Sequence, residues 1–124
     1  MHTLWGKVKR GKDRGKGFGF PTANIPFRKA IPEGIYISQT RVEKTVYPSL
    51  TFIGAAKTFD EYDVWAETYI FSFSEDIYDQ WITVTLIKKI RGNKKFRSVE
   101  SLLSQMRRDE KRAQDYFRKK GILV

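Results

Sequence analysis

The fold is constrained most by a succession of short β-rich segments with tight connections, followed by one helical segment. Residues 34–42 and 45–53 are rich in β-branched and aromatic side chains, and residues 43–44 between them suit a hairpin turn. Residues 63–73 and 80–90 repeat this composition and are joined by a polar stretch. Sequential strands with hairpin connections favour antiparallel pairing.

The first third of the chain shows a weaker strand pattern. Residues 3–10 alternate loosely between apolar and basic side chains, as a half-exposed strand does. Residues 11–19 follow as a Gly- and Lys-rich loop, and residues 22–25, bracketed by two prolines, are too short for a central strand. Residues 27–33 are expected to be a connector, and residues 54–62 a second mobile loop.

The apolar period changes after residue 98, from two to three and four, which is typical of an amphipathic helix. The apolar residues at this spacing are Val99, Leu102, Leu103, Met106, Ala113 and Phe117. Ser98 suits the N-cap and Gly121 follows a basic last turn, so we expect a helix of roughly twenty residues. In the preceding strand one face carries Ile82, Val84, Leu86 and Ile90.

Together these segments predict a mainly β fold. We expect a small closed antiparallel six-stranded barrel of the Greek-key type, with one long C-terminal α-helix packed against it. The 124 residues fit one domain, residues 1–124. No apolar run reaches membrane-spanning length and the N-terminus lacks a signal pattern, so the expectation is a soluble, cytoplasmic protein. We also expect a monomer.

Composition limits the chemistry that the chain can perform. It has no cysteine and a single histidine, which excludes disulfides, thiolate zinc sites and cysteine nucleophiles and argues against histidine catalysis. The net charge is +10, with the basic residues gathered in the first 30 and last 37 residues and the acidic ones between them. This segregation suggests an anionic partner, either nucleic acid or a nucleotide polyphosphate. The alternative is a solvated basic surface, which is the better explanation for the C-terminal helix taken alone.

A glycine-rich stretch, residues 15–24, is the first candidate site. Its three glycines are spaced by two, which lets the backbone approach an anion closely. Thr22 and Asn24 then supply a hydroxyl and an amide carbonyl, both suited to a hard cation. The stretch therefore indicates a phosphate and metal site, while the spacing alone fits an irregular connection between strands as well.

The second candidate is Glu67, which alternation places among aromatic residues. One face of residues 63–73 carries Trp65, Glu67, Tyr69, Phe71 and Phe73. A carboxylate partly desolvated by rings has its pKa raised, which makes it a better base near neutral pH. The alternative is that this face points to solvent and Glu67 is an ordinary surface acid.

Three groups of residues resemble the signatures of the riboflavin kinase family, which phosphorylates riboflavin with ATP to give flavin mononucleotide (FMN). Gly-Phe-Pro-Thr-Ala-Asn at residues 19–24 resembles the first, and residues 66–70 with 76–78 resemble the second. Residues 91–98, followed by Leu102, Gln105 and Asp109, resemble the third. The groups occur in the family's order over nearly the whole chain, as in the kinase domain of bacterial bifunctional riboflavin kinase/FAD synthetases.

The resemblance implies a role for residues in each group. Glu67 corresponds to the catalytic base acting on the ribityl hydroxyl, and Thr22 and Asn24 to the residues that hold magnesium and the nucleotide phosphates. The remaining nucleotide-binding positions are Gly11, Lys16, Gly17, Ile70 and Tyr78. The flavin-binding positions are Arg91, Lys94 and Phe96. The helix after residue 98 would form one wall of the isoalloxazine pocket.

Three positions depart from the family pattern. Asp79 stands where the family usually has Gly, Tyr69 stands where a His is common, and residues 54–59 lack the usual Pro. These departures bear on the contacts of the nucleotide loop rather than on the chemistry.

The resemblance implies riboflavin and ATP as substrates, FMN and ADP as products, and Mg or another divalent cation as cofactor, with no membrane or nucleic-acid partner. Two alternatives stay open. One is a basic barrel that binds single-stranded nucleic acid by stacking, and the other is a flavin-binding protein without turnover. The first is disfavoured because the aromatic residues near Glu67 lie in the acidic third of the chain.

Overall fold

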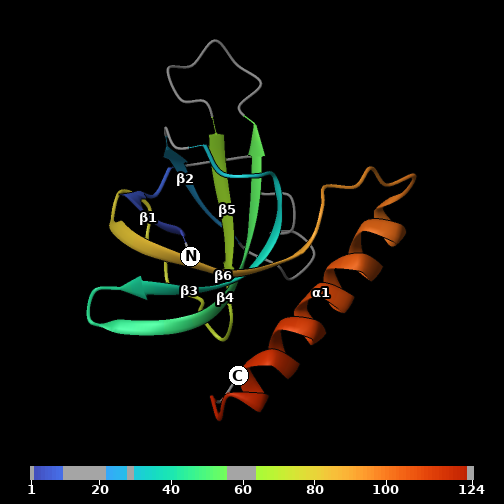
Figure 1. Cartoon of the computed structure of the whole chain (residues 1–124). Coiled ribbons are helices and arrows are strands. Elements are labelled where there is room, and N and C mark those ends of the chain that lie inside the picture. Colours follow the sequence, from blue (N-terminus) through green and yellow to red (C-terminus); the bar gives the residue numbers. More distant parts are fainter. Residues whose placement is uncertain (1, 10–21, 28–29, 56–63, 123–124) are drawn as a thin grey trace.

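The computed structural model describes residues 2–9, 22–27, 30–55 and 64–122 (Figure 1). Within these ranges the chain forms six strands and one helix. In chain order these are β1 (His2–Lys7), β2 (Ala23–Phe27), β3 (Gly34–Val42), β4 (Thr45–Ala55), β5 (Val64–Ile70), β6 (Trp81–Arg91) and α1 (Val99–Lys119).

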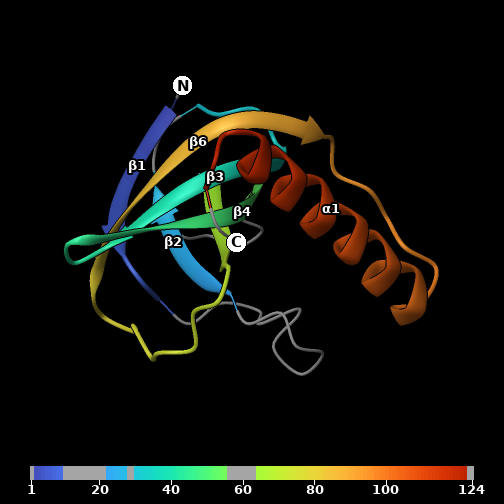
Figure 2. The same ribbon diagram turned by 90° about the horizontal axis from the view of Figure 1, so that it is seen from below.

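The strands form one antiparallel sheet in the order β1-β6-β3-β4-β5-β2, which curls around a common interior (Figure 2). Its two ends meet where the Lys9 N–H donates to the Asn24 carbonyl at 2.7 Å. The predicted mainly β fold, a six-stranded antiparallel barrel with a C-terminal helix, is therefore confirmed.

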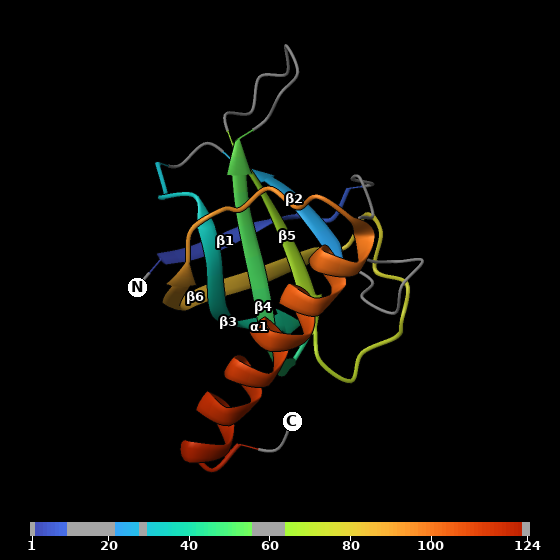
Figure 3. The same ribbon diagram turned by 90° about the vertical axis from the view of Figure 1, so that its right-hand side faces the viewer.

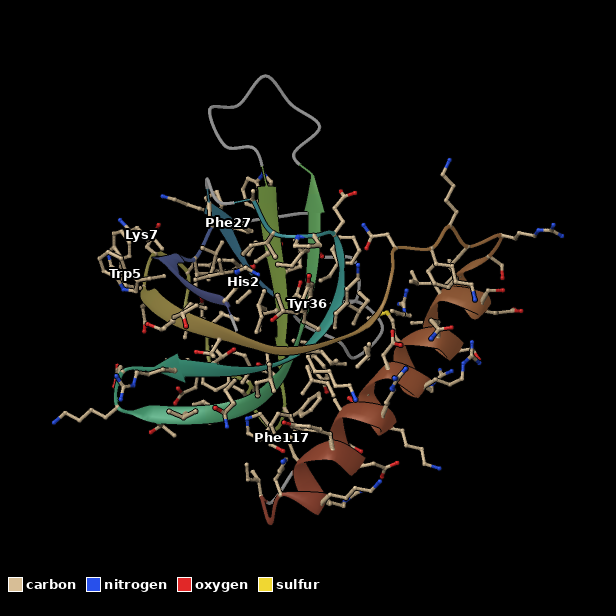
Figure 4. All side chains as sticks on the ribbon, in the orientation of Figure 1. His2, Trp5, Lys7, Phe27, Tyr36 and Phe117 are labelled. Atoms are coloured by element: carbon tan, nitrogen blue, oxygen red, sulfur yellow. The ribbon has the colours of Figure 1, made fainter. Side chains whose placement is uncertain are left out.

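The seam between β1 and β2 depends on a glycine. A Cβ on Gly6 would overlap Cγ2 of Ile25, whose side chain is fully buried. Only a residue without a side chain lets the two strands approach this closely. On the outer side of the same strand, Trp5 stacks on Trp81 of β6 with ring centroids 4.3 Å apart, away from α1 (Figure 4).

Two apolar clusters stabilise the molecule. The first fills the barrel and includes Ile25, Ile53, Ala66, Ile82, Val84 and Leu86. The second lies between the outer face of the sheet and α1, and comprises Ile35, Ile37, Leu50, Phe71, Ile90, Ala113 and Phe117. The second cluster fixes α1 across β4, so the helix forms one side of the space next to the outer face of the barrel (Figure 3).

The helix bounds agree with the sequence prediction. The Ser98 side chain accepts a hydrogen bond from the Ser101 N–H at 3.1 Å, which is a regular N-cap. At the other end Gly121 has φ 78°, and the Ile122 N–H donates to the Phe117 carbonyl at 2.9 Å. Among the described helical residues, no stretch is both long and apolar enough to cross a membrane.

Residues 23–27 form strand β2, which ends the strand order, so they are not a central strand, as predicted; a proline without N–H is tolerated there. Two other predicted details were wrong. β5 stops at Ile70, because Ser72 has φ 57° and turns the chain. Ile90 packs in the second cluster rather than with Ile82, since the register between β3 and β6 slips twice.

Candidate active site

Two pockets open on either side of strand β5. The larger has a volume of about 680 Å³ and lies between the outer face of the barrel, the segment 92–98 and α1. The smaller, of about 270 Å³, lies between the start of β2, the end of β5 and residues 73–78. Thr22 lines both pockets, so they meet at the start of β2.

A carboxylate and an amide stand side by side near this junction. Asn24 on β2 pairs with Glu67 on β5 in the antiparallel register. Directly opposed residues of an antiparallel pair point to the same face, so both lie on the outer face. Thr22, which lines both pockets, comes two residues before Asn24. Glu67 lines the larger pocket.

The polar atoms beside Glu67 are buried and unsatisfied. Asn24 is 1% exposed, and neither its Oδ1 nor its Nδ2 finds a hydrogen-bond partner among the described residues. The same holds for Oγ1 of Thr22. Buried polar atoms without partners are costly, and in a native protein they commonly await a ligand, water or ion.

Arg91 anchors the opposite wall of the larger pocket. Its Nε donates to Asp109 Oδ1 and Oδ2 of α1 at 2.9 and 3.0 Å, and its Nη2 donates to Oδ2 at 2.7 Å. Gln105 Nε2 also donates to Asp109 at 2.9 Å, and Arg112 of α1 donates to the Ile90 carbonyl at 3.0 Å. This network fixes α1 to the end of β6 and so sets the width of the pocket.

Aromatic and basic groups complete the mouth of the larger pocket. The Phe96 ring lies 6.0 Å from both the Arg91 guanidinium carbon and Lys94 Nζ. Leu102 and Met106 of α1 supply an apolar wall. A planar apolar ligand carrying polar or anionic groups would find complementary surfaces here.

Tyr69 lines the larger pocket next to Glu67 in the outward row of β5. Burial, and then a hydrogen bond to the Glu110 side chain and its charge, raise the pKa of Tyr69 from 10.0 to about 12. Tyr69 also packs edge-on against Phe71 with centroids 5.3 Å apart. It therefore remains a neutral phenol at physiological pH.

The structure sorts the predicted residues into the two pockets. Of the predicted nucleotide set, Thr22, Ile70 and Tyr78 line the smaller pocket, and Asn24 lines neither pocket. Gly11, Lys16 and Gly17 lie outside the described residues. All three predicted flavin residues, Arg91, Lys94 and Phe96, line the larger pocket. The predicted mobile loop at residues 54–62 falls mostly outside the described residues as well.

Sequence reasoning assigned no site role to Asp109 or Thr68. Asp109 is 5% exposed and lies on the apolar stripe of α1, between Met106 and Ala113. A carboxylate on an apolar stripe is rarely buried without a partner, so its position in the sequence could have indicated a role. Thr68 faces the barrel interior, on the strand face opposite Glu67, and borders the smaller pocket.

The departure at Asp79 keeps the turn in place. Asp79 has φ 66°, a left-handed conformation that glycine adopts freely and Asp tolerates. Its N–H donates to the Val8 carbonyl at 2.9 Å, which ties the turn to the end of β1. Asp79 therefore adopts the same left-handed backbone conformation that a glycine would adopt at this turn.

Comparison with known sequences identifies one matching family and several related proteins. The chain matches the Flavokinase family, described as riboflavin kinase, over residues 1–117. It is 38% identical over 119 residues to the trifunctional protein RibF/MnmA of Mycoplasmoides gallisepticum, covering 94% of this chain and 18% of that protein. It is 32% identical over 115 residues to the bifunctional riboflavin kinase/FMN adenylyltransferase of Escherichia coli strain K12, covering 90% and 37%. The chain thus spans well under half the length of these curated relatives.

Two solved structures share the fold. A Streptococcus pneumoniae protein named as a macrolide-efflux protein superposes with a TM-score of 0.81 at 32% identity, over 90% of this chain and 38% of that one. Riboflavin kinase from Trypanosoma brucei superposes with a TM-score of 0.66 at 24% identity, over 94% of this chain and 80% of that one.

Proposed function

The chain belongs to the riboflavin kinase family, and from this we propose that it transfers the terminal phosphoryl group of ATP to riboflavin, giving FMN and ADP. The observation that carries the proposal is the junction of the two pockets. Thr22 lines both of them, and Asn24 stands opposite Glu67 beside it. Two substrates bound in the two pockets would therefore meet next to a carboxylate and unsatisfied polar atoms.

The size and lining of each pocket suggest which substrate it takes. The larger pocket, of about 680 Å³, has an apolar wall on α1 and the Phe96 ring at its mouth, which suits the three-ring isoalloxazine system. The smaller pocket, lined by Ile70, Phe73 and Tyr78, suits the nucleotide. The ribityl chain of riboflavin would then extend along β5 toward Thr22.

Glu67 is proposed as the general base. Phosphoryl transfer from ATP to an alcohol requires mainly positioning, charge neutralisation, and a carboxylate that orients the hydroxyl and accepts its proton. Glu67 lies in the larger pocket and next to the junction, so it can reach a hydroxyl that points toward the nucleotide.

The residues at the junction fit a divalent cation such as Mg²⁺. Thr22 Oγ1 and Asn24 Oδ1 are buried oxygens without partners among the described residues, and oxygen is the ligand that hard cations prefer. The described part of the chain holds no cluster of three or more His, Asp or Glu residues, so most of the remaining ligands would be phosphate oxygens and water. When bound, the cation neutralises phosphate charge during transfer.

The test is the variant Glu67→Gln, assayed for FMN formed from riboflavin, ATP and magnesium. We expect kcat to fall by about 10²- to 10⁴-fold, the usual contribution of positioned proton transfer, with the thermal midpoint of unfolding (Tm) kept. Glu43→Gln, in the β3–β4 hairpin turn, is the matched control and should retain activity.

The outcomes separate the alternatives. Near-normal kcat in Glu67→Gln would remove Glu67 from the role of base. If the unsubstituted chain quenched riboflavin fluorescence but formed no FMN, it would be a flavin-binding protein without turnover, and the proposed function would be wrong.

A further inference from the structure

The barrel interior holds a continuous chain of five hydroxyl groups. We call it the hydroxyl ladder; in order it consists of Thr40, Ser49, Ser38, Thr51 and Thr68. The successive oxygen–oxygen distances are 2.9, 2.7, 2.8 and 2.9 Å. All five residues are fully buried, and they connect β3, β4 and β5.

Counting hydrogens shows that the ladder has one donor too many. Each hydroxyl carries one hydrogen, so five hydroxyls offer five donors. Four bonds within the ladder use four of them. One hydroxyl hydrogen is therefore left to find an acceptor outside the ladder, and leaving it buried and unpaired is costly.

The surroundings of the two ends differ. Thr68 borders the smaller pocket, whereas neither described pocket is lined by Thr40. Among the described residues Thr51 is the partner of the Thr68 hydroxyl and Ser49 that of the Thr40 hydroxyl. If every hydroxyl donates toward Thr68, Thr40 uses its hydrogen within the ladder and the surplus hydrogen lies beside the pocket.

We propose that the Thr68 hydroxyl donates a hydrogen bond to an acceptor oxygen of the nucleotide in the smaller pocket, which makes Thr68 a nucleotide-binding residue set in place by the ladder. This inference rests on the proposed function. Thr68 lines the smaller pocket but is 0% exposed, so contact between its hydroxyl and the nucleotide requires a small shift of the pocket wall when the nucleotide binds. A nucleotide that fills the pocket would supply the missing acceptor, and donation along four consecutive bonds strengthens the last one.

The position of Thr68 fits this role. Thr68 pairs with Ala23 of β2, the residue between Thr22 and Asn24. It follows Glu67 directly and faces the barrel interior, while Glu67 faces the larger pocket. The two neighbours on β5 would thus serve different substrates, Glu67 the riboflavin hydroxyl and Thr68 the nucleotide.

The test compares Thr68→Val with Thr40→Val, because each removes one terminal hydroxyl at nearly constant volume. Binding of ADP with magnesium is measured by calorimetry, and binding of riboflavin by fluorescence quenching, so no turnover is needed. We expect Thr68→Val to raise the Kd for ADP by roughly 3- to 10-fold, which corresponds to one hydrogen bond. The Kd for riboflavin should stay within about twofold, and Thr40→Val should leave both values within about twofold.

Thr68→Ser keeps a hydroxyl and should have the nucleotide affinity of the unsubstituted protein. If Thr68→Val does not fold, the comparison of Thr68→Ala with Thr68→Ser replaces it. Unchanged ADP affinity in Thr68→Val, or an equal loss in Thr40→Val, would overturn the inference while leaving the kinase proposal intact. If the unsubstituted chain bound riboflavin but no adenine nucleotide, the proposed function and this inference would both be wrong.

Discussion

Asn24 shows how a single residue can be unfavourable for stability and useful for binding. Its amide is buried with no partner among the described residues, and such a group destabilises the folded state. The same residue pairs with Glu67, which lines the larger pocket, and lies two residues after Thr22, which lines both pockets. A buried group of this kind is preorganised, because a ligand entering the site does not have to displace a competing protein partner.

Asn24→Ala should therefore weaken binding of ADP with magnesium by on the order of 10-fold or more, the range of a hydrogen bond to a charged group. Riboflavin affinity should change by less than about twofold, and Tm should fall little, because an unsatisfied amide is removed. Calorimetry, fluorescence quenching and thermal unfolding measure the three quantities. Equal weakening of both ligands together with a lower Tm would show that Asn24 is simply needed for folding.

The raised pKa of Tyr69 should make the stability of the protein fall at alkaline pH. Its pKa of about 12 in the folded chain exceeds the ordinary 10.0, chiefly through burial and then through Glu110. The stabilisation from the neutral phenol is therefore complete below pH 10 and is lost as pH rises from 10 to 12. Between pH 10 and pH 12 the Tm of Tyr69→Phe should fall less than the Tm of the unsubstituted protein. Tyr47→Phe on β4 is the control, and equal slopes for all three proteins would contradict the prediction.

At the scale of elements, the placement of α1 depends on one ion pair more than on its many surface charges. The side chains of Arg91 and Asp109 are 19% and 7% exposed and make three hydrogen bonds, whereas those of Arg118 and Asp115 are 58% and 50% exposed and make one at 3.2 Å. Removing one partner of a buried pair leaves an uncompensated charge, while an exposed pair contributes little.

Asp109→Asn should lower the free energy of unfolding by about 2–4 kcal/mol and raise the KM for riboflavin more than the KM for ATP, because α1 walls the larger pocket. Asp115→Asn, the matched control on the same helix, should cost less than about 0.5 kcal/mol. Urea unfolding and steady-state kinetics check both. Similar losses in the two variants would mean that the Arg91–Asp109 pair does not fix the helix.

The elements also show where sequence reasoning stops. The period of three and four predicted α1 correctly, because a helix that buries one face shows a stripe of apolar residues in its local sequence. Alternation likewise placed Glu67 on one face with Tyr69, and both residues line the larger pocket. The position of Ile90 could not be predicted, because it depends on register slips against β3, and Pro26 concealed β2 and with it the pairing of Asn24 with Glu67.

At the scale of the whole molecule, closure of the barrel brings distant segments together. β1 and β2 meet only because Gly6 leaves room for Ile25, and the Lys9–Asn24 bridge follows directly after. The junction of the pockets lies beside this seam, so the seam supports the site as well as the fold.

Gly6→Ala should destabilise the protein by about 1–3 kcal/mol, the usual cost of overpacking a core, since the fully buried Ile25 has no space to move. Nucleotide affinity should fall as well, because Thr22 and Asn24 are on the displaced strand. Gly92→Ala is the control, as a Cβ there would meet no atom within 4 Å. Thermal unfolding decides the matter, and an unchanged Tm in Gly6→Ala would show that the seam can widen at no cost.

Thr22 belongs to the walls of both pockets, and this has a thermodynamic consequence. A side chain that two ligands touch at once couples their affinities, and the coupling free energy is the same whichever ligand binds first. Whatever factor saturating ADP imposes on the riboflavin Kd must therefore reappear, unchanged, as the factor that saturating riboflavin imposes on the ADP Kd.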